Sequence, residues 1–193
     1  MSNETELAQL RAELAELRET TAALADRAAI AACINRQTRG VDRHDVELMT
    51  SSYHADGVAR FGPAIVPAAE YGEWSNEAHG DRFGLHAHHL TTHNCEIDGE
   101  VAYCETYVLG TFLASDQQRA SLVSGRYFDQ LEKRDGEWRI LVRRTVIDAC
   151  IEGDASFLGV FRGTQLEEED FWSRKDMSYL RPLDIETPVP AWH

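Results

Sequence analysis

The histidine-rich stretch LHAHHLTTHN, residues 85–94, is the densest group of side chains in the sequence that can move protons or bind a metal. It holds four of the chain's eight histidines, His86, His88, His89 and His93. An imidazole can act as a general acid or base near neutral pH, and it is also a common ligand of zinc and iron. The chemistry open to these four residues depends on which of them share a face.

The alternation of side chains along a strand assigns the four histidines to two faces. Residues two apart in a strand point to the same side of the sheet. His89 alternates with small and apolar residues, so we expect it to point into the interior, with His93 deeper on the same face. His86 and His88 alternate with polar residues, and we expect them to face solvent or a partner chain.

Two other interpretations compete with proton transfer. His86 and His88 supply two metal ligands, but the sequence offers only generic carboxylates as a third, so we predict no metal site. Taken alone, an inward-facing His89 is typical of a core histidine that is hydrogen-bonded to a carbonyl group. The rest of the sequence has to decide between these interpretations.

Four segments in the second half of the chain have the period-two pattern of strands. Asp-Gly pairs at residues 98–99 and 135–136 separate the first from the second and the third from the fourth, and this pair is a strong hairpin signal. We therefore expect an antiparallel meander of strands at residues 83–97, 100–114, 119–134 and 137–150.

Helical patterns occupy the first half of the chain. Apolar residues step by three and four along residues 7–24, which is the heptad pattern of a helix that packs through one stripe. We expect this helix to end at Gly40 and to pack either on its own domain or on a neighbouring subunit. The heptad positions are Leu7, Leu10, Leu14, Leu17, Thr21 and Leu24.

Shorter elements connect this helix to the meander. We expect a short helix capped by Asp42 or Asp45, a short strand at residues 58–62 and a helix at residues 66–80. Helices that precede a meander predict an α+β fold, with the helices covering one face of a curved antiparallel sheet.

Composition narrows the class of protein. A chain of 193 residues with 43% hydrophobic residues suits one domain with a core, and a net charge of −14 argues against nucleic acid and anionic membranes as partners. No apolar run approaches the roughly 20 residues that span a bilayer, and the N-terminus has no signal-peptide pattern. We expect a soluble cytoplasmic protein with reduced cysteines, which are Cys33, Cys95, Cys104 and Cys150.

Three blocks in order, GVDRHD, EIDGEVA and RDGEWRI, resemble the SnoaL-like branch of the nuclear transport factor 2 (NTF2-like) superfamily. Their motifs are nearest to those of hexachlorocyclohexane dehydrochlorinase and bile acid 7α-dehydratase. The resemblance implies an α+β cone in which helices pack on a strongly curved sheet around an apolar pocket. The resemblance covers a SnoaL-like domain at residues 26–151. The N-terminal amphipathic helix, residues 1–25, and a C-terminal tail that we expect to be extended, residues 152–193, lie outside it.

The resemblance implies an Asp–His dyad. The aspartate of the GVD block is Asp42, and the histidine of the strand before the EIDG turn is His89. An arginine that stabilises developing negative charge falls on Arg143, with Arg144 as the adjacent alternative. One position departs from the family pattern, because Gln37 stands where the two related enzymes have a tyrosine or a lysine, and an amide cannot serve as an acid.

These residues together favour a lyase that needs no cofactor. His89 would take a proton from a small hydrophobic ring-containing substrate, and water, halide or formaldehyde would leave. A non-catalytic ligand-binding or assembly subunit of the same fold is the alternative, and an isomerase or cyclase with the same base is another. The resemblance also implies a homotrimer. The residues expected to bind the substrate are Tyr107, Tyr127, Trp74 and His93. Packing in the core is the alternative explanation for the three aromatic residues.

Overall fold

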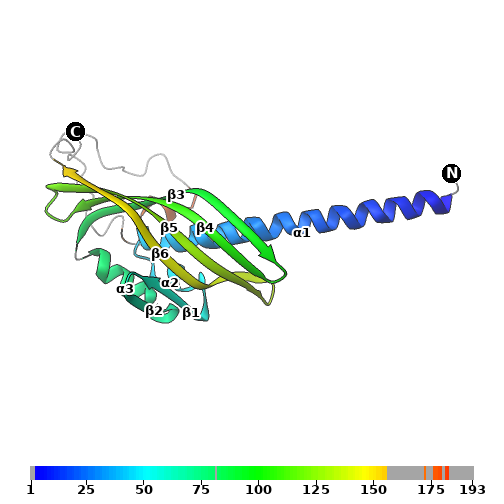
Figure 1. Cartoon of the computed structure of the whole chain (residues 1–193), viewed down its shortest axis with the longest axis horizontal. Coiled ribbons are helices and arrows are strands. Elements are labelled where there is room, and N and C mark those ends of the chain that lie inside the picture. Colours follow the sequence, from blue (N-terminus) through cyan, green and yellow to red (C-terminus); the bar gives the residue numbers. More distant parts are fainter. Residues whose placement is uncertain (1–2, 81, 156–171, 173–175, 180, 183–193) are drawn as a thin grey trace.

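The computed structural model describes residues 3–80, 82–155, 172, 176–179 and 181–182. Three helices precede a run of long strands, and one further strand pair lies between the helices (Figure 1). The helices are α1 (Asn3–Asp42), α2 (Val46–Thr50), α3 (Ala68–Gly80) and the short 3-10 helix η2 (Met177–Tyr179). The strands are β1 (Tyr53–Phe61), β2 (Ala64–Pro67), β3 (Phe83–Asp98), β4 (Val101–Ala114), β5 (Arg119–Arg134) and β6 (Glu137–Asp154).

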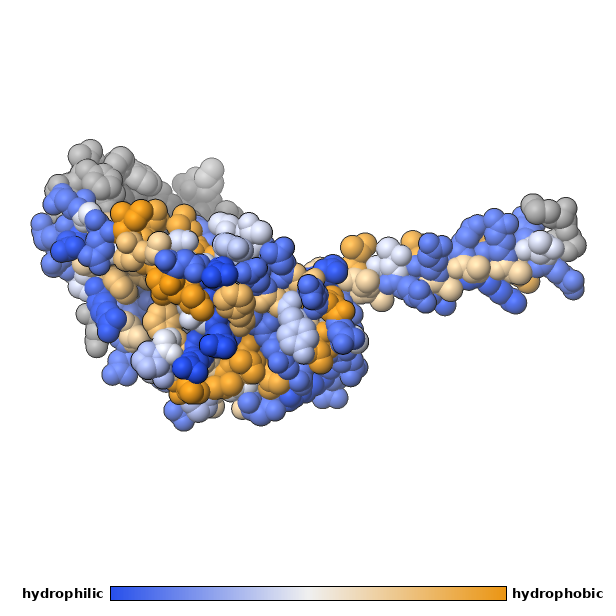
Figure 2. All heavy atoms as spheres, viewed as in Figure 1, coloured by the Kyte–Doolittle hydropathy of each residue, from blue (hydrophilic) through white to orange (hydrophobic). Residues whose placement is uncertain are grey.

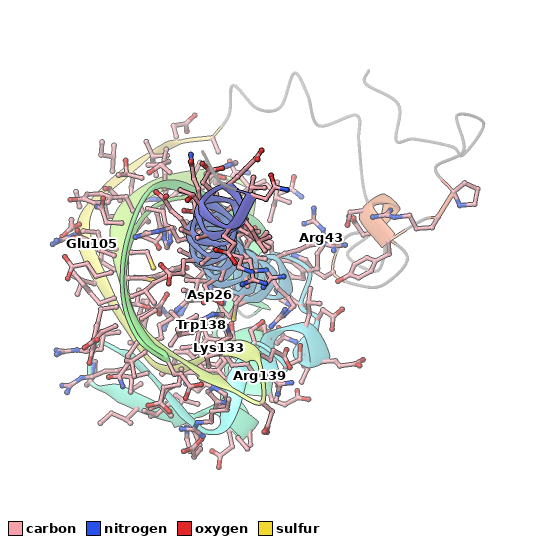
Figure 3. The ribbon with its side chains drawn as sticks, turned by 90° about the vertical axis from the view of Figure 1, so that its right-hand side faces the viewer. Asp26, Arg43, Glu105, Lys133, Trp138 and Arg139 are labelled. Carbon is pink, nitrogen blue, oxygen red and sulfur yellow. The ribbon has the colours of Figure 1, made fainter. Side chains whose placement is uncertain are left out.

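The six strands form one open sheet in the order β2-β1-β6-β5-β4-β3. β3 to β6 are antiparallel neighbours, as the sequence predicts, whereas β1 pairs with β6 in parallel. The two Asp-Gly turns are where the hairpins reverse, and Gly99, Asp135 and Gly136 have the positive φ angles that such turns need. The α+β fold with a strongly curved sheet is therefore confirmed, and the sheet curls around one end of α1 (Figure 3).

The C-terminal half of α1 fills the concave side of the sheet. Ile30, Cys33 and Ile34 are buried against Leu131 and Ile140 of the central strands. Burial of each such aliphatic side chain contributes about 1.5–3 kcal/mol. This packing fixes the end of α1, and with it Asp42, relative to the sheet.

The end of α1 differs from the sequence-based expectation. The helix continues past Gly40, and His44 takes the left-handed conformation that closes it, with φ 51°. The backbone N–H groups of His44 and Asp45 donate to the carbonyls of Val41 and Gly40, which is the Schellman pattern. Gly40 instead allows α2 to pack closely on α1, because a methyl group at this position would lie 2.7 Å from the Met49 side chain.

The N-terminal part of α1 does not pack on its own domain, which was one of the two expectations for it. Every residue from Asn3 to Ala25 is exposed, and the helix projects from the sheet-bearing body (Figure 1). The helix is held at the point where it leaves the sheet. Asp26 accepts hydrogen bonds from Lys133 Nζ at 2.7 Å and from Trp138 Nε1 at 2.8 Å (Figure 3).

A β-bulge divides β3 into two halves with opposite alternation. His88 is opposite Gly110 and Leu90 is opposite Val108, but His93 is opposite Thr106, so β3 has one extra residue between Leu90 and His93. The extra residue reverses which side chains face inward. The expectation that His89 points into the interior is therefore wrong, since His89 is exposed.

Among the described residues, no helix has the length and apolar character needed to cross a membrane. All four cysteines are free thiols. In the C-terminal segment, the described residues contact the end of α1. Tyr179 donates a hydrogen bond to Asp45 at 2.8 Å, and Arg43 forms an ion pair with Asp176 at 3.2 Å. Most of the expected extended tail at residues 152–193 lies outside the described residues.

Candidate active site

Asp42 and His88 form a hydrogen-bonded pair at the junction of α1 and β3. The His88 Nδ1 atom lies 2.7 Å from Asp42 Oδ1. The backbone N–H of His88 also donates to both carboxylate oxygens, at 3.1 and 3.0 Å, which holds the carboxylate in one orientation. The two side chains are 14% and 10% exposed, respectively. The structure therefore pairs the expected Asp42 with His88 and not with the expected His89.

His88 faces an apolar cavity of about 510 Å³. Because Nδ1 is bound to Asp42, the Nε2 atom is the ring nitrogen available to a ligand. The cavity volume lies in the range of about 300–1,000 Å³ that is typical of small-molecule sites. Aromatic and aliphatic side chains from α3 and the sheet make most of the wall, among them Phe61, Tyr71, Trp74, Phe83, Val108, Phe112, Val123, Tyr127 and Ile147.

Three other histidines surround the dyad, and burial keeps them neutral. Burial and the nearby imidazoles lower the pKa of His86 to about 3. Burial and the neighbouring His79 imidazole lower the pKa of His44 to about 4, and burial also lowers the pKa of His79. The described Trp172 of the C-terminal segment stacks on His44, with ring centroids 4.0 Å apart. These neutral rings form a weakly polar wall behind His88.

Arg143 does not lie in the cavity wall. Its guanidinium is 1% exposed and makes two hydrogen bonds of 2.7 Å to the two carboxylate oxygens of Asp129. A third hydrogen bond goes to Gln37 Oε1, and the Tyr127 ring covers the guanidinium at 4.1 Å. The structure therefore places Arg143 behind the cavity wall, in a buried ion pair, and not beside the dyad.

The four expected substrate-binding residues separate into two groups. Tyr127 and Trp74 line the cavity. Tyr107 is 40% exposed and points away from the cavity, and Arg126 lies over its ring at 5.9 Å. His93 lies beyond the bulge, where its Nδ1 atom is 2.9 Å from Thr106 Oγ1. Neither Tyr107 nor His93 is part of the cavity wall in the described part of the chain.

Several polar residues of the wall were not predicted from the sequence, and three of them lie on α3 or just after it. Tyr71, His79 and Arg82 line the cavity, and helical spacing places Tyr71, Trp74 and His79 on one face of α3. The His79 Nδ1 atom lies 2.7 Å from the carbonyl oxygen of Ser75, so this nitrogen carries the proton and Nε2 is an acceptor. The helical period could have identified this face.

The Tyr71 hydroxyl provides a polar link between the cavity and the buried Arg143. It interacts with the side chains of Gln37 and Ser75, and Gln37 in turn accepts from Arg143. Burial raises the pKa of Tyr71, and burial likewise raises the pKa of Tyr127. Both phenols therefore stay protonated and can donate a hydrogen bond to a ligand.

Asp42, His86 and His88 also bring three potential metal-ligand atoms within 4.8 Å of one another. In this arrangement His88 Nδ1 is hydrogen-bonded to Asp42, and His86 Nε2 lies 3.2 Å from the carbonyl oxygen of Val41. A metal ion bound by this set would have to replace the hydrogen bond between Asp42 and His88. A proton between His88 Nδ1 and Asp42 accounts for the distance between these two atoms equally well.

Solved structures of known proteins share this fold. Hexachlorocyclohexane dehydrochlorinase LinA-type3 from Novosphingobium barchaimii is 21% identical, with a TM-score of 0.63 over 67% of this chain and 91% of that one. A provisionally named scytalone dehydratase from Novosphingobium aromaticivorans is 18% identical, with a TM-score of 0.62 over 68% and 90%. Rv3472 from Mycobacterium tuberculosis, a protein of unknown function, is 26% identical, with a TM-score of 0.58 over 65% and 77%.

No curated protein matches the chain. A model of the SnoaL-like domain matches residues 22–144, which is more than half of the sequence. The match spans the sheet-packed part of α1, Asp42, His88, strands β1 to β5 and the first part of β6. The protein therefore belongs to the SnoaL-like domain family.

Proposed function

We propose that the protein is a cofactor-independent lyase in which His88 is the general base and Asp42 orients it. The observation that carries this proposal is the hydrogen bond of 2.7 Å between His88 Nδ1 and Asp42, made at the wall of an apolar cavity. Solved structures of a dehydrochlorinase and a provisionally named dehydratase with the same fold support the choice of reaction class.

In the proposed mechanism each member of the dyad has a separate task. Asp42 accepts a hydrogen bond from the Nδ1–H group of His88, so the lone pair of the imidazole is on Nε2 and faces the ligand. When Nε2 takes a proton from a substrate C–H bond, the two electrons of that bond form the new C=C bond, and the leaving group departs with its own bonding pair. The carboxylate compensates the positive charge that the imidazole gains.

Tyr71 can replace the acid that is missing at Gln37. The Gln37 side chain is fully buried, and its carbonyl oxygen accepts from Arg143, but its partner Tyr71 reaches the cavity. A protonated phenol that faces the cavity can hydrogen-bond a departing hydroxide or halide. For a substrate that loses formaldehyde, the same base would take the hydroxyl proton, and the electrons of that O–H bond would form the C=O bond of formaldehyde. The electrons of the broken C–C bond would form a C=C bond and expel a leaving group from the next carbon of the substrate.

The cavity wall supports a hydrophobic ring compound as substrate. Most of its lining side chains are aromatic or aliphatic, and the neutral histidines behind His88 add no fixed charge. Arg82 at the exposed edge of the cavity is a cation that can attract a carboxylate or phenolate on the substrate. We therefore propose an alicyclic or aromatic substrate that carries one polar or anionic substituent.

The test is a mass-spectrometric screen of ring compounds that bear hydroxyl, halide or hydroxymethyl leaving groups, with and without chelator. The His88→Ala and Asp42→Asn variants are compared with His89→Ala, a matched change on the exposed side of the same strand. Loss of about 10²–10⁴-fold in rate in the first two variants, with His89→Ala unchanged, supports the lyase. Product of unchanged mass would instead indicate an isomerase or cyclase.

A ligand carrier is the competing function, and the same screen separates it from an enzyme. A carrier would bind ring compounds without converting them, and binding would not require the carboxylate of Asp42. Tight binding of a compound by wild type and Asp42→Asn alike, with no conversion of any compound in the screen, would contradict the lyase.

A further inference from the structure

Residues 3–25 of α1 form a helical segment of more than six turns in which every residue is exposed. Rising about 1.5 Å per residue, this segment spans about 34 Å. It is rich in Ala, Leu, Glu and Arg, which are strong helix formers. Figure 2 shows orange and pale orange side chains in a row along it, between hydrophilic ones.

The five leucines of the heptad stripe are all exposed. Their exposed fractions range from 46% at Leu14 to 63% at Leu24. Thr21 completes the stripe, and its hydroxyl donates to the carbonyl of Leu17 at 2.8 Å, so it brings no unsatisfied polar group to a contact. Apolar residues at successive a and d positions pack against the same positions of another helix.

The charged residues beside the stripe select the kind of partner. With Leu7 at position a, Glu6 and Glu13 occupy g positions, while Arg11 and Arg18 occupy e positions. In a parallel pair of copies, each g residue meets the e residue five positions later on the other helix, which joins Glu6 to Arg11 and Glu13 to Arg18. An antiparallel pair would bring glutamate to glutamate and arginine to arginine.

We propose that residues 3–24 form a parallel, in-register coiled coil with the same segment of another copy of this chain. The complementary charges above fit a second copy better than an anionic surface, because this segment carries five glutamates and two arginines. A parallel coil has a rotation axis along its length, so the domains that follow lie at one end of it.

The anchoring of α1 explains how so short a stripe can associate. Fewer than three heptads are marginal for separate peptides, because nucleating a helix is costly. Here the helix is already nucleated by its buried half, and Asp26 and Arg27 fix its exit, the latter through a hydrogen bond to the Cys95 carbonyl at 2.9 Å. Association therefore needs only side-chain packing along a helix that already exists.

The test is disulfide cross-linking of the full-length protein at single positions, in a Cys150→Ser background that removes the exposed native thiol. Leu10→Cys at a d position should link to itself in another copy at least tenfold faster than Ala12→Cys at the outward f position. An antiparallel coil would instead link Leu10→Cys to Thr21→Cys in a mixture of the two variants. Equal rates at positions 10 and 12, or the antiparallel pattern, would overturn the proposal.

Charge reversal provides an independent readout by sedimentation. Glu6→Arg with Glu13→Arg places like charges across the seam and should weaken association at low salt by about tenfold or more. Adding Arg11→Glu and Arg18→Glu to the same chain restores opposite charges and should restore association. The coiled coil would be contradicted if the unsubstituted protein sediments as a monomer. It would also be contradicted if the variant with four substitutions associates no more strongly than the variant with two.

Discussion

Replacing Asp129 by asparagine should destabilise the fold strongly, because it leaves the Arg143 guanidinium buried without its counter-charge. Burial alone would lower the pKa of Arg143, but the Asp129 carboxylate holds that pKa well above its ordinary value. Both partners are almost inaccessible to solvent, and both carboxylate oxygens accept from the guanidinium at 2.7 Å. Water cannot replace the lost charge at such a site.

The size of the effect follows from this burial. Removing one partner of a buried ion pair costs about 3–5 kcal/mol. With a urea dependence of about 2 kcal/mol per molar, a loss of about 4 kcal/mol lowers the unfolding midpoint by about 2 M. Replacing both partners by apolar residues, as in Asp129→Leu with Arg143→Met, should recover most of that loss, since no charge then remains buried.

The assay is urea unfolding followed by circular dichroism, with Asp56→Asn as the matched control. Asp56 binds Arg134 with a similar two-pronged geometry, at 2.7 and 3.2 Å, but on the exposed surface. Its loss should leave the midpoint nearly unchanged, because solvent screens exposed pairs. Equal midpoints for Asp129→Asn and Asp56→Asn would refute the reasoning, and so would a double variant as unstable as Asp129→Asn.

Three further predictions concern single residues. The pKa of His86 is about 3 in the folded protein and about 6.5 in the unfolded chain. Between these values the unfolded chain binds a proton that the folded protein does not, so the free energy of unfolding falls as the pH is lowered from about 6.5 toward 3. The loss is about 1.4 kcal/mol per pH unit, so His86→Gln should flatten the decline of unfolding free energy between pH 6 and 4, and an unchanged slope would contradict this. Gly40→Ala should lower the free energy of unfolding by about 1–3 kcal/mol, because the added methyl group would lie 2.8 Å from the α2 backbone. Gly153→Ala is the control, since a methyl group there would meet nothing within 4 Å. Equal melting temperatures for the two variants would refute this prediction. Tyr71→Phe should lower turnover about tenfold or more while Tyr107→Phe, outside the cavity, does not, and equal rates for the two would remove Tyr71 from the mechanism.

The sequence predicted the meander well because its signals are local. Period-two alternation and two Asp-Gly turns define β3 to β6 within a few residues. The parallel pairing of β1 with β6 has no such signal, since it depends on contacts between segments about 80 residues apart. The end of α1 was placed at Gly40 because glycine is common after helices, but here Gly40 makes room for α2 and His44 closes the helix.

The sequence predicted that Asp42 pairs with a histidine of β3, but it did not predict which histidine. Asp42 and a histidine of β3 were expected, and the choice between His88 and His89 rested on uninterrupted alternation. The bulge between Leu90 and His93 reverses that alternation, and no residue type in the stretch announces it. Arg143 was assigned by resemblance, and only the fold reveals that Asp129 lies opposite it on the neighbouring strand.

The most direct test of the proposed mechanism is the turnover of two single variants of adjacent histidines, measured on the best substrate from the screen. The account predicts that His88→Ala loses about 10²–10⁴-fold in kcat while His89→Ala keeps the wild-type rate, with both proteins folded by circular dichroism. A His88→Ala enzyme as active as wild type, or a loss confined to His89→Ala, would contradict the assignment of His88 as the base.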